Sequence, residues 1–274
     1  MKPTEIKCNL HTHTLFCDGK NSPEEIVLAA LEAGMETIGF SGHSYTPFDL
    51  SYAMSPEGTQ AYLAELSRLK AAYGDQICIL AGIEQDFYAP PAKGEYDFRI
   101  GSVHYVLLDG AYCAVDSSPE LLERAVIEHC GGDWYRFARV YYDTVAQLME
   151  VVSPDVVGHF DLITKFNERF PKFEEHHPRY LRAALESLDC LLERDAVIEI
   201  NTGAINRGYR RLPYPAPILL RRIAEKRGRV TLSSDAHAKE QLTGGFIDAS
   251  RILLASGIST VEVRDRHGWR TVRL

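Results

Sequence analysis

The sequence lacks any excess of basic residues over acidic ones. Its 274 residues include 30 Lys and Arg against 38 Asp and Glu, which gives a formal net charge of −8. Proteins that bind long nucleic acids usually present a basic face, so this balance argues against such a partner. It leaves room for local basic clusters that bind a small anion. With 45% hydrophobic and 25% charged residues, the composition is that of an ordinary globular protein.

Long apolar runs and paired cysteines are also missing. No uncharged apolar run approaches the ~18 residues of a membrane span, and residues 1–13 contain no apolar stretch of the kind found in secretory signals. The six cysteines are scattered without a C-x-x-C pair, which disfavours structural zinc clusters and thioredoxin-like chemistry. We therefore expect a cytoplasmic protein with reduced thiols and no membrane association.

No linker, charge block or internal repeat divides the chain, so we expect one domain over residues 1–274. Short β-prone runs alternate with helical stretches, and several runs are continuously apolar, as in parallel strands buried on both faces. Repeated strand–helix units predict a parallel sheet, either open or closed as a barrel. The predicted strands are 6–10, 37–40, 77–83, 98–103, 156–160, 197–200 and 230–232.

Three Ser-Pro-Glu segments, which begin at Ser22, Ser55 and Ser118, indicate helix starts, because Ser caps a helix and Pro suits its first position. Residues 119–152 are long for one crossover, and we expect them to hold two helices as an excursion over the sheet. Residues 259–274 are predicted to form a terminal hairpin or edge strand.

Each of the seven predicted strands ends at a side chain that can bind a metal or make a hydrogen bond. In parallel α/β folds, functional sites are built at this end of the sheet. A single His or Glu there is more often structural than a ligand, but burying so many ionisable groups at one rim without an ion is expensive. The strand-end residues are His11, His13, His43, Glu84, His104, His159, Asp161, Asn201, Asp235 and His237.

The spacing within two of these groups strengthens the prediction of a metal site. Residues two apart in a strand point to the same face, so His11 and His13 can hold one ion, and Asp235 and His237 have the same spacing. An H-x-H pair alone is a weak signal. The His11/His13 pair and the Asp235/His237 pair, together with further strand-end ligands, form a strong one. Imidazole and carboxylate suit Zn, Mn or Fe, and the sequence does not select among these metals.

Seven polar segments lie at these strand ends. They are His11-Thr12-His13-Thr14 with Cys17-Asp18-Gly19, Ser41-Gly42-His43-Ser44, Gly82-Ile83-Glu84, Gly101-Ser102-Val103-His104, Gly158-His159-Phe160-Asp161, Glu199-Ile200-Asn201-Thr202 and Ser234-Asp235-Ala236-His237. In this order they resemble the polymerase-and-histidinol-phosphatase (PHP) superfamily over nearly the whole chain. The first segment and the chain length further resemble the histidinol-phosphate phosphatases of histidine biosynthesis.

That resemblance implies a single domain with a distorted TIM-like (β/α)7 barrel and three divalent metal ions (Zn, Mn or Fe) at its C-terminal rim. It implies a first ion on His11, His13, Glu84 and Asp235. A second ion would share the bridging Glu84 and add His104 and His159. The third would take Asp18, His43 and His237, although some superfamily members have His at the position of Asp18.

The implied activity is that of a metal-dependent phosphomonoesterase, with L-histidinol phosphate as the expected small-molecule substrate. Two ions that share Glu84 would lower the pKa of a bridging water and generate hydroxide at neutral pH, so Glu84 is a catalytic candidate. Asp161 is the second catalytic candidate, because it can protonate the leaving alkoxide or orient a ligand His. A purely structural role for Asp161 is the alternative.

Phosphate calls for basic partners, because a guanidinium can bond two oxygens with one planar fork. Arg207 and Arg210 lie just past the sixth strand and are candidates for phosphate binding, with a solvated basic loop as the alternative. Lys165 and Ser44 are further candidates. The residues expected to line the substrate pocket are Tyr45, Asp49, Tyr52, Asp86, Phe87 and Tyr88.

Other activities are compatible with parts of this pattern. The nearest is a PHP phosphoesterase that acts on another small phosphoester, such as a nucleotide, a sugar phosphate or phosphotyrosine. An amidohydrolase barrel also begins with H-x-H, but it commonly uses a carboxylated Lys where this chain offers Glu84. A non-catalytic metal-binding domain would be expected to lack ligands. The oligomeric state is not predicted.

Overall fold

The main sheet follows the predicted alternation of strands and helices. The computed structural model describes residues 5–274; residues 1–4, part of the predicted domain and of the segment expected to carry no secretory signal, lie outside the described residues. In space the strands are ordered β1-β2-β3-β4-β7-β8-β9-β10-β11, and all neighbours are parallel except the last pair. These strands are β1 Cys8–Asn9, β2 Thr37–Phe40, β3 Cys78–Asp86, β4 Phe98–Ser102, β7 Val156–Val157, β8 Val197–Asn201, β9 Arg229–Ser233, β10 Thr260–Asp265 and β11 Gly268–Arg273.

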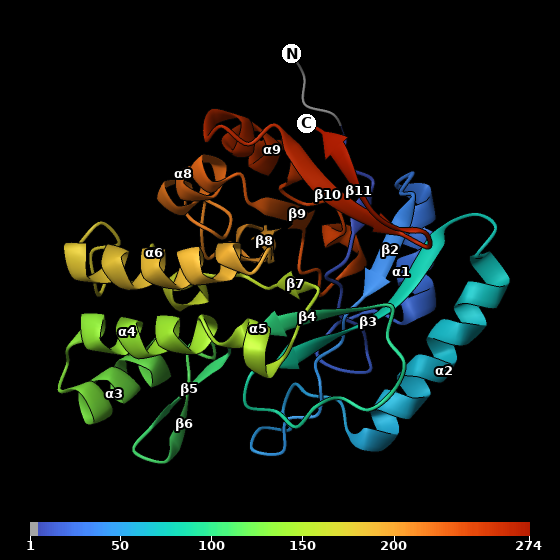
Figure 1. The fold of residues 1–274 in the computed structure, drawn as a ribbon. Helices are drawn as coiled ribbons and strands as arrows, with labels where there is room; N and C mark the ends of the chain where they lie inside the picture. The colour runs from blue at the N-terminus through green and yellow to red at the C-terminus, as the bar shows by residue number, and fades with distance from the viewer. Residues whose placement is uncertain (1–4) are drawn as a thin grey trace.

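The sheet curls until its first strand meets β9. Just past the two strand ends, Thr12 and Ala236 form a parallel bridge. The His13 N–H donates to the Ala236 carbonyl at 2.8 Å, and the Ala236 N–H donates to the His11 carbonyl at 3.1 Å. Seven strands of this sheet thus surround one centre, namely β1, β2, β3, β4, β7, β8 and β9. The last two, β10 and β11, leave as an external hairpin (Figure 1). The predicted single-domain, distorted TIM-like (β/α)7 barrel is confirmed.

Two strands are shorter than predicted. β1 covers only two of residues 6–10, and β7 covers only two of residues 156–160. Beyond the end of each strand the pairing continues as single contacts, which are the bridge of Thr12 to Ala236 after β1 and the hydrogen bond from the Gly158 N–H to the Gly101 carbonyl at 2.9 Å after β7.

The three predicted helix starts are confirmed. The Ser22 side chain accepts from the Glu25 N–H while Glu25 accepts from the Ser22 N–H, a complete capping box. Ser55 and Ser118 cap their helices in the same way, without the reciprocal Glu contact. The helices are α1 Pro23–Glu32, α2 Pro56–Tyr73, α3 Pro119–Cys130, α4 Trp134–Val145, α5 Leu148–Val151, α6 Pro178–Glu193, α7 Gly203–Asn206, α8 Pro217–Lys226 and α9 Phe246–Ala255.

Helices surround the sheet on its outer side. α1 and α2 cover β2 and β3 over one cluster of buried apolar side chains, and a larger cluster lies beneath the remaining helices. Residues 119–152 hold α3, α4 and the single-turn α5, and α4 packs between α3 and α6 (Figure 1). A small hairpin of β5 (Tyr105–Leu108) and β6 (Ala111–Ala114) follows β4 beside the barrel mouth. Among the described residues, no helix combines the length and apolar character needed to cross a membrane.

Candidate metal centre

A cavity of about 400 Å³ lies at the C-terminal ends of the barrel strands. The parallel register brings these ends together, so side chains that are far apart in the sequence face one space. The cavity is lined by Asp18, His43, Asp49, Ser51, Tyr52, Glu84, His104, Tyr105, Asp116, Ser117, His159, Leu162, Lys165, Arg207, Tyr209, Asp235 and His237. His11 and His13 lie buried beneath this lining.

Glu84 occupies the middle of the cluster. It comes from β3, a strand that is buried over its whole length, and its side chain is 1% exposed. Its Oε1 lies 2.9 Å from His159 Nε2 and 3.3 Å from His104 Nε2. Its Oε2 lies 2.9 Å from His43 Nδ1 and 3.3 Å from His11 Nε2. One carboxylate therefore faces imidazoles on both sides, the arrangement expected of a bridging ligand.

His11 and His13 point to the same side of the chain, as their spacing predicts. Both Nε2 atoms approach the Asp235 carboxylate, at 3.7 Å from His11 and 3.3 Å from His13. The bridge between Thr12 and Ala236 sets this register, because each residue sits next to the side chains that meet. The two strands that close the barrel thus supply three potential ligands to one point.

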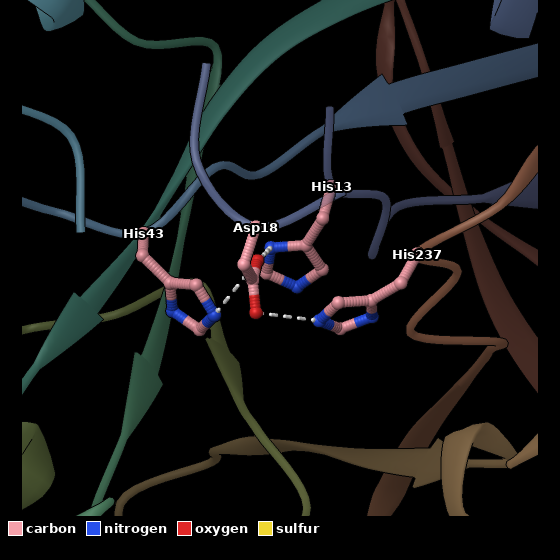
Figure 2. Close-up of side chains that lie close together, drawn as sticks. All are labelled: His13, Asp18, His43 and His237. Atoms are coloured by element: carbon pink, nitrogen blue, oxygen red, sulfur yellow. Dashed lines mark hydrogen bonds and ion pairs between the residues drawn. The ribbon is translucent and has the colours of Figure 1, made fainter. Parts of the chain in front are cut away.

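A further group surrounds Asp18 at the more open side of the cavity. Figure 2 shows its carboxylate among the imidazoles of His13, His43 and His237. The Asp18 oxygens lie 3.1 Å from His237 Nε2 and 3.6 Å from both His43 Nε2 and His13 Nδ1. The Asp18 side chain is 32% exposed, so this group is the most accessible to solvent. His13 therefore faces two groups, one through each ring nitrogen.

The residues present fit bound cations. Within residues 5–274, the buried atoms His11 Nε2, His13 Nε2 and Glu84 Oε2 have no hydrogen-bond partner, although they face one another. Four sets of three or four ligand atoms lie within 4.8 Å of each other around them. Buried polar atoms without partners are costly, and a divalent ion placed between imidazole nitrogens and carboxylate oxygens removes that cost.

The buried groups shift one another's pKa. Burial and the neighbouring imidazoles of His237 and His43 lower the pKa of His13 to about 3, which leaves this imidazole neutral. Burial opposes ionisation of Glu84, but His11 and the other imidazoles outweigh it and hold the pKa of the Glu84 carboxyl well below its usual value. Both shifts favour the forms that bind metal, which are the neutral imidazole of His13 and the ionised carboxylate of Glu84.

Two of the four candidates for phosphate binding reach the cavity. Arg207 follows α7, and its Nη2 donates to Asp235 Oδ2 at 2.8 Å while its Nη1 donates to the Asp235 carbonyl at 3.1 Å. Lys165 Nζ donates to the Asp116 carboxylate at 3.0 Å and to the Asp116 carbonyl at 2.8 Å. Both cations are thus held at the wall by acidic neighbours and remain next to the open space.

The other two candidates lie outside the cavity lining. The Arg210 guanidinium donates to the Thr164 carbonyl at 2.8 Å and pairs with the Glu175 carboxylate. Ser44 is buried, and its Oγ accepts a hydrogen bond from the Asp86 N–H at 3.3 Å. The sequence correctly placed both next to strand ends, but loop conformation and local partners turn their side chains away from the cavity.

Asp161 is also not part of the lining. Its side chain is completely buried, and its Oδ2 accepts a hydrogen bond from the Ala216 N–H at 2.9 Å. Burial outweighs the nearby Arg210 guanidinium and raises the pKa of Asp161 to about 6. The side chain therefore contacts the start of α8 and not the space in which a substrate can lie.

Several residues near the cavity carry signals that the strand-end pattern missed. Glu199 lies inside β8, and its Oε1 is 2.6 Å from His11 Nδ1. Asp116 lies beside Lys165 in the short connection between β6 and α3. Among the residues expected to line the pocket, Asp49 and Tyr52 do so. Asp86 instead faces His104 Nδ1 at 3.3 Å, whereas Tyr45, Phe87 and Tyr88 lie outside the lining.

Comparisons with known proteins identify the family to which the chain belongs. The sequence profile of the PHP domain family matches residues 9–203. A protein of Deinococcus radiodurans named "Probable histidinol-phosphatase" is 30% identical, over 94% of this chain and 97% of its own length. The "Histidinol-phosphatase" of Bacillus subtilis is 28% identical, over 83% of this chain and 92% of its own length.

A solved structure shows the same fold. The histidinol phosphate phosphatase of Lactococcus lactis subsp. lactis, described in complex with zinc, L-histidinol and phosphate, superimposes with a TM-score of 0.71. The superposition covers 97% of this chain and 99% of that chain, at 19% sequence identity. From the profile match and the full-length relatives, the chain belongs to the PHP domain family and, within it, to the group of enzymes named histidinol-phosphatase.

Proposed function

We propose that this enzyme hydrolyses L-histidinol phosphate to L-histidinol and phosphate in histidine biosynthesis, with divalent metal ions as cofactors. The observation that carries the proposal is the cluster of imidazoles and carboxylates around Glu84, which opens into a cavity that also holds Arg207 and Lys165. The similar Lactococcus enzyme, described with zinc, L-histidinol and phosphate, supports the choice of substrate.

The proposed centre holds three ions. The first would take His11, His13, Glu84 and Asp235, and the second would take Glu84, His104 and His159. The third would take Asp18, His43 and His237, and the 3.6 Å separation of His13 Nδ1 from Asp18 supports His13 as a neighbour of this ion also. When bound, such ions lower the pKa of a coordinated water and offset negative charge on a phosphoryl group.

The protein's own part in the reaction is to bind the phosphate group and to discriminate against substrates without one. A phosphate that enters the cavity meets the Arg207 guanidinium, which already donates to Asp235 and can turn a second N–H toward a phosphate oxygen. Lys165, held by Asp116, adds a second positive charge to the lining. These cations favour a dianionic phosphoester over a neutral ester or amide.

The remaining wall suits a cationic leaving group. Asp49 lines the cavity, and its Oδ2 accepts from the Tyr105 hydroxyl at 2.6 Å, which fixes the carboxylate in place. Tyr52 and Tyr209 add aromatic surface. L-histidinol carries an amine and an imidazole, which match carboxylates and rings.

Because all six cysteines are free, we place the enzyme in the cytoplasm.

The test is phosphate release from L-histidinol phosphate beside a panel of a nucleotide, a sugar phosphate and phosphotyrosine. Each assay is run with added Mn²⁺ or Zn²⁺ and with an EDTA control. We expect a kcat/KM for L-histidinol phosphate orders of magnitude above the panel and its loss on chelation. Flat activity across the panel, with metal bound, would assign the enzyme to another small phosphoester.

A further inference from the structure

Glu199 is a buried carboxylate that contacts two proposed metal-ligand segments without reaching the cavity. It lies in β8 with no exposed surface. Its Oε2 accepts from the His159 N–H at 2.7 Å and from Asn201 Nδ2 at 2.9 Å. Its Oε1 lies 2.6 Å from His11 Nδ1 and accepts from the Ser233 hydroxyl at 2.8 Å. One side chain thus links the ends of β1, β7, β8 and β9.

The partners on the two sides of this carboxylate differ in kind. Those of Oε2 can only donate, because one is a backbone N–H and the other is the Asn201 amide nitrogen. The orientation of that amide is set by its Oδ1, which accepts from the Gly203 N–H at 2.8 Å. Those of Oε1, the His11 imidazole and the Ser233 hydroxyl, can each donate or accept.

We propose that Glu199 is a positioning residue for metal binding, because its carboxylate holds His11 in the tautomer that carries hydrogen on Nδ1. A carboxylate oxygen 2.6 Å from Nδ1 accepts that hydrogen, so the lone pair remains on Nε2. His11 Nε2 then faces Glu84 Oε2 at 3.3 Å and Asp235 Oδ1 at 3.7 Å. The proposal rests on the metal binding in the proposed function and adds the residue that prepares one ligand for it.

The atom to be prepared is buried and without a hydrogen-bond partner among the described residues. Glu84 Oε2, its nearest carboxylate oxygen, is likewise unpartnered there, so the two atoms are not joined by a hydrogen bond despite their separation of 3.3 Å. This is the arrangement of two ligands that share an ion. A hydrogen on His11 Nε2 would occupy the direction in which the ion binds.

Glu199→Gln tests this with little change in shape. The amide oxygen must take the place of Oε2, because both partners there can only donate. Its NH₂ then faces His11 Nδ1 and Ser233 Oγ, which can both accept. Every hydrogen bond is kept, so the fold survives, but His11 is forced to carry its hydrogen on Nε2. The matched control is Ser233→Ala, which removes another donor to Glu199 and leaves the tautomer of His11 as it is.

Binding of Zn²⁺ to the metal-free proteins is measured by competition with a chelating indicator, together with their thermal unfolding. We expect Glu199→Gln to bind the ion about 10- to 100-fold more weakly, with a metal-free Tm close to that of the wild type. Ser233→Ala should retain wild-type affinity. Unchanged affinity in folded Glu199→Gln, or equal losses in both variants, would overturn the proposal.

A second measurement, on the wild-type protein, does not depend on whether Glu199→Gln folds. In Zn²⁺-loaded protein, the short contact between His11 and Glu199 should give a low-field imidazole N–H proton resonance that is missing from His11→Gln. A wild-type spectrum without that resonance overturns the assigned tautomer. Neither readout uses substrate, so an enzyme that binds Zn²⁺ but does not hydrolyse L-histidinol phosphate would contradict the proposed function and leave this inference standing.

Discussion

Replacement of Arg207 by Ala should chiefly raise the KM for the phosphoester. The guanidinium lies on the cavity wall with 21% of its side chain exposed, and Asp235 holds one edge of it at 2.8 Å. Its position is therefore fixed before substrate arrives, so little conformational entropy is lost when it binds a phosphate oxygen. A charge-assisted hydrogen bond of this kind contributes about 1.5–3 kcal/mol, which corresponds to roughly a 10- to 150-fold higher KM.

The kcat should change much less, provided that Arg207 grips phosphate equally in the ground state and the transition state. Asp235 loses its partner in the variant, so the assay is run with Mn²⁺ at saturation to separate weaker metal binding from weaker substrate binding. Arg207→Lys keeps the charge and loses the planar fork, and its KM should lie between those of the wild type and Arg207→Ala.

The same loop supplies a control for charge alone. Arg211 lies four residues away with 89% of its side chain exposed and pairs with Glu168. Arg211→Ala changes the net charge by the same amount but should leave the KM at the wild-type value. An unchanged KM in Arg207→Ala, or an equal rise in both variants, would refute a direct contact with phosphate and leave Arg207 as a partner of Asp235 only.

Three further predictions concern the metal centre and its surroundings. Glu84→Gln should lower bound metal and reduce turnover by about three orders of magnitude, since metal ions contribute several kcal/mol to such reactions; full turnover in a metal-depleted variant would contradict this. Mn²⁺ added to chelated protein at about 100 times its dissociation constant should raise the free energy of unfolding by about 2.7 kcal/mol per ion, so a Tm that is independent of Mn²⁺ concentration would show that the folded centre does not bind it. The third prediction uses the pKa of Asp161, which burial raises to about 6 from about 3.9 in the unfolded chain. The folded state binds this proton more tightly, so the contribution of Asp161 to the free energy of unfolding should fall by about 2 kcal/mol as the pH rises from 4 to 6. Metal-free Asp161→Asn should lack this fall in urea unfolding, and its kcat should show the wild-type pH profile, whereas loss of the basic limb of that profile would make Asp161 the proton donor.

The strand-end pattern could predict the barrel and the gathering of potential ligands for one physical reason. In a parallel sheet every strand ends at the same rim, so residues such as His43 and Glu84 must meet once the strands are located. The structure places Glu84 Oε2 2.9 Å from His43 Nδ1 as that logic requires. No similar constraint applies to residues in loops. Arg210 and Lys165 both follow strand ends, but Arg210 turns to Glu175 and Lys165 turns to Asp116 beside the cavity.

Glu199 shows where a closer use of strand geometry would have found more. Side chains two apart in a strand share a face, so Glu199 and the strand-end residue Asn201 point to the same side of β8. In a closed barrel of this kind, one face of each strand points inward. A carboxylate among the apolar residues of Val197–Asn201 must therefore find donors inside the barrel or remain costly. The donors that it finds belong to strand ends that carry proposed ligands. An acidic residue that points into the barrel two positions before the end of its strand thus indicates a residue that orients metal ligands. Inspection of the strand ends alone does not find such a residue.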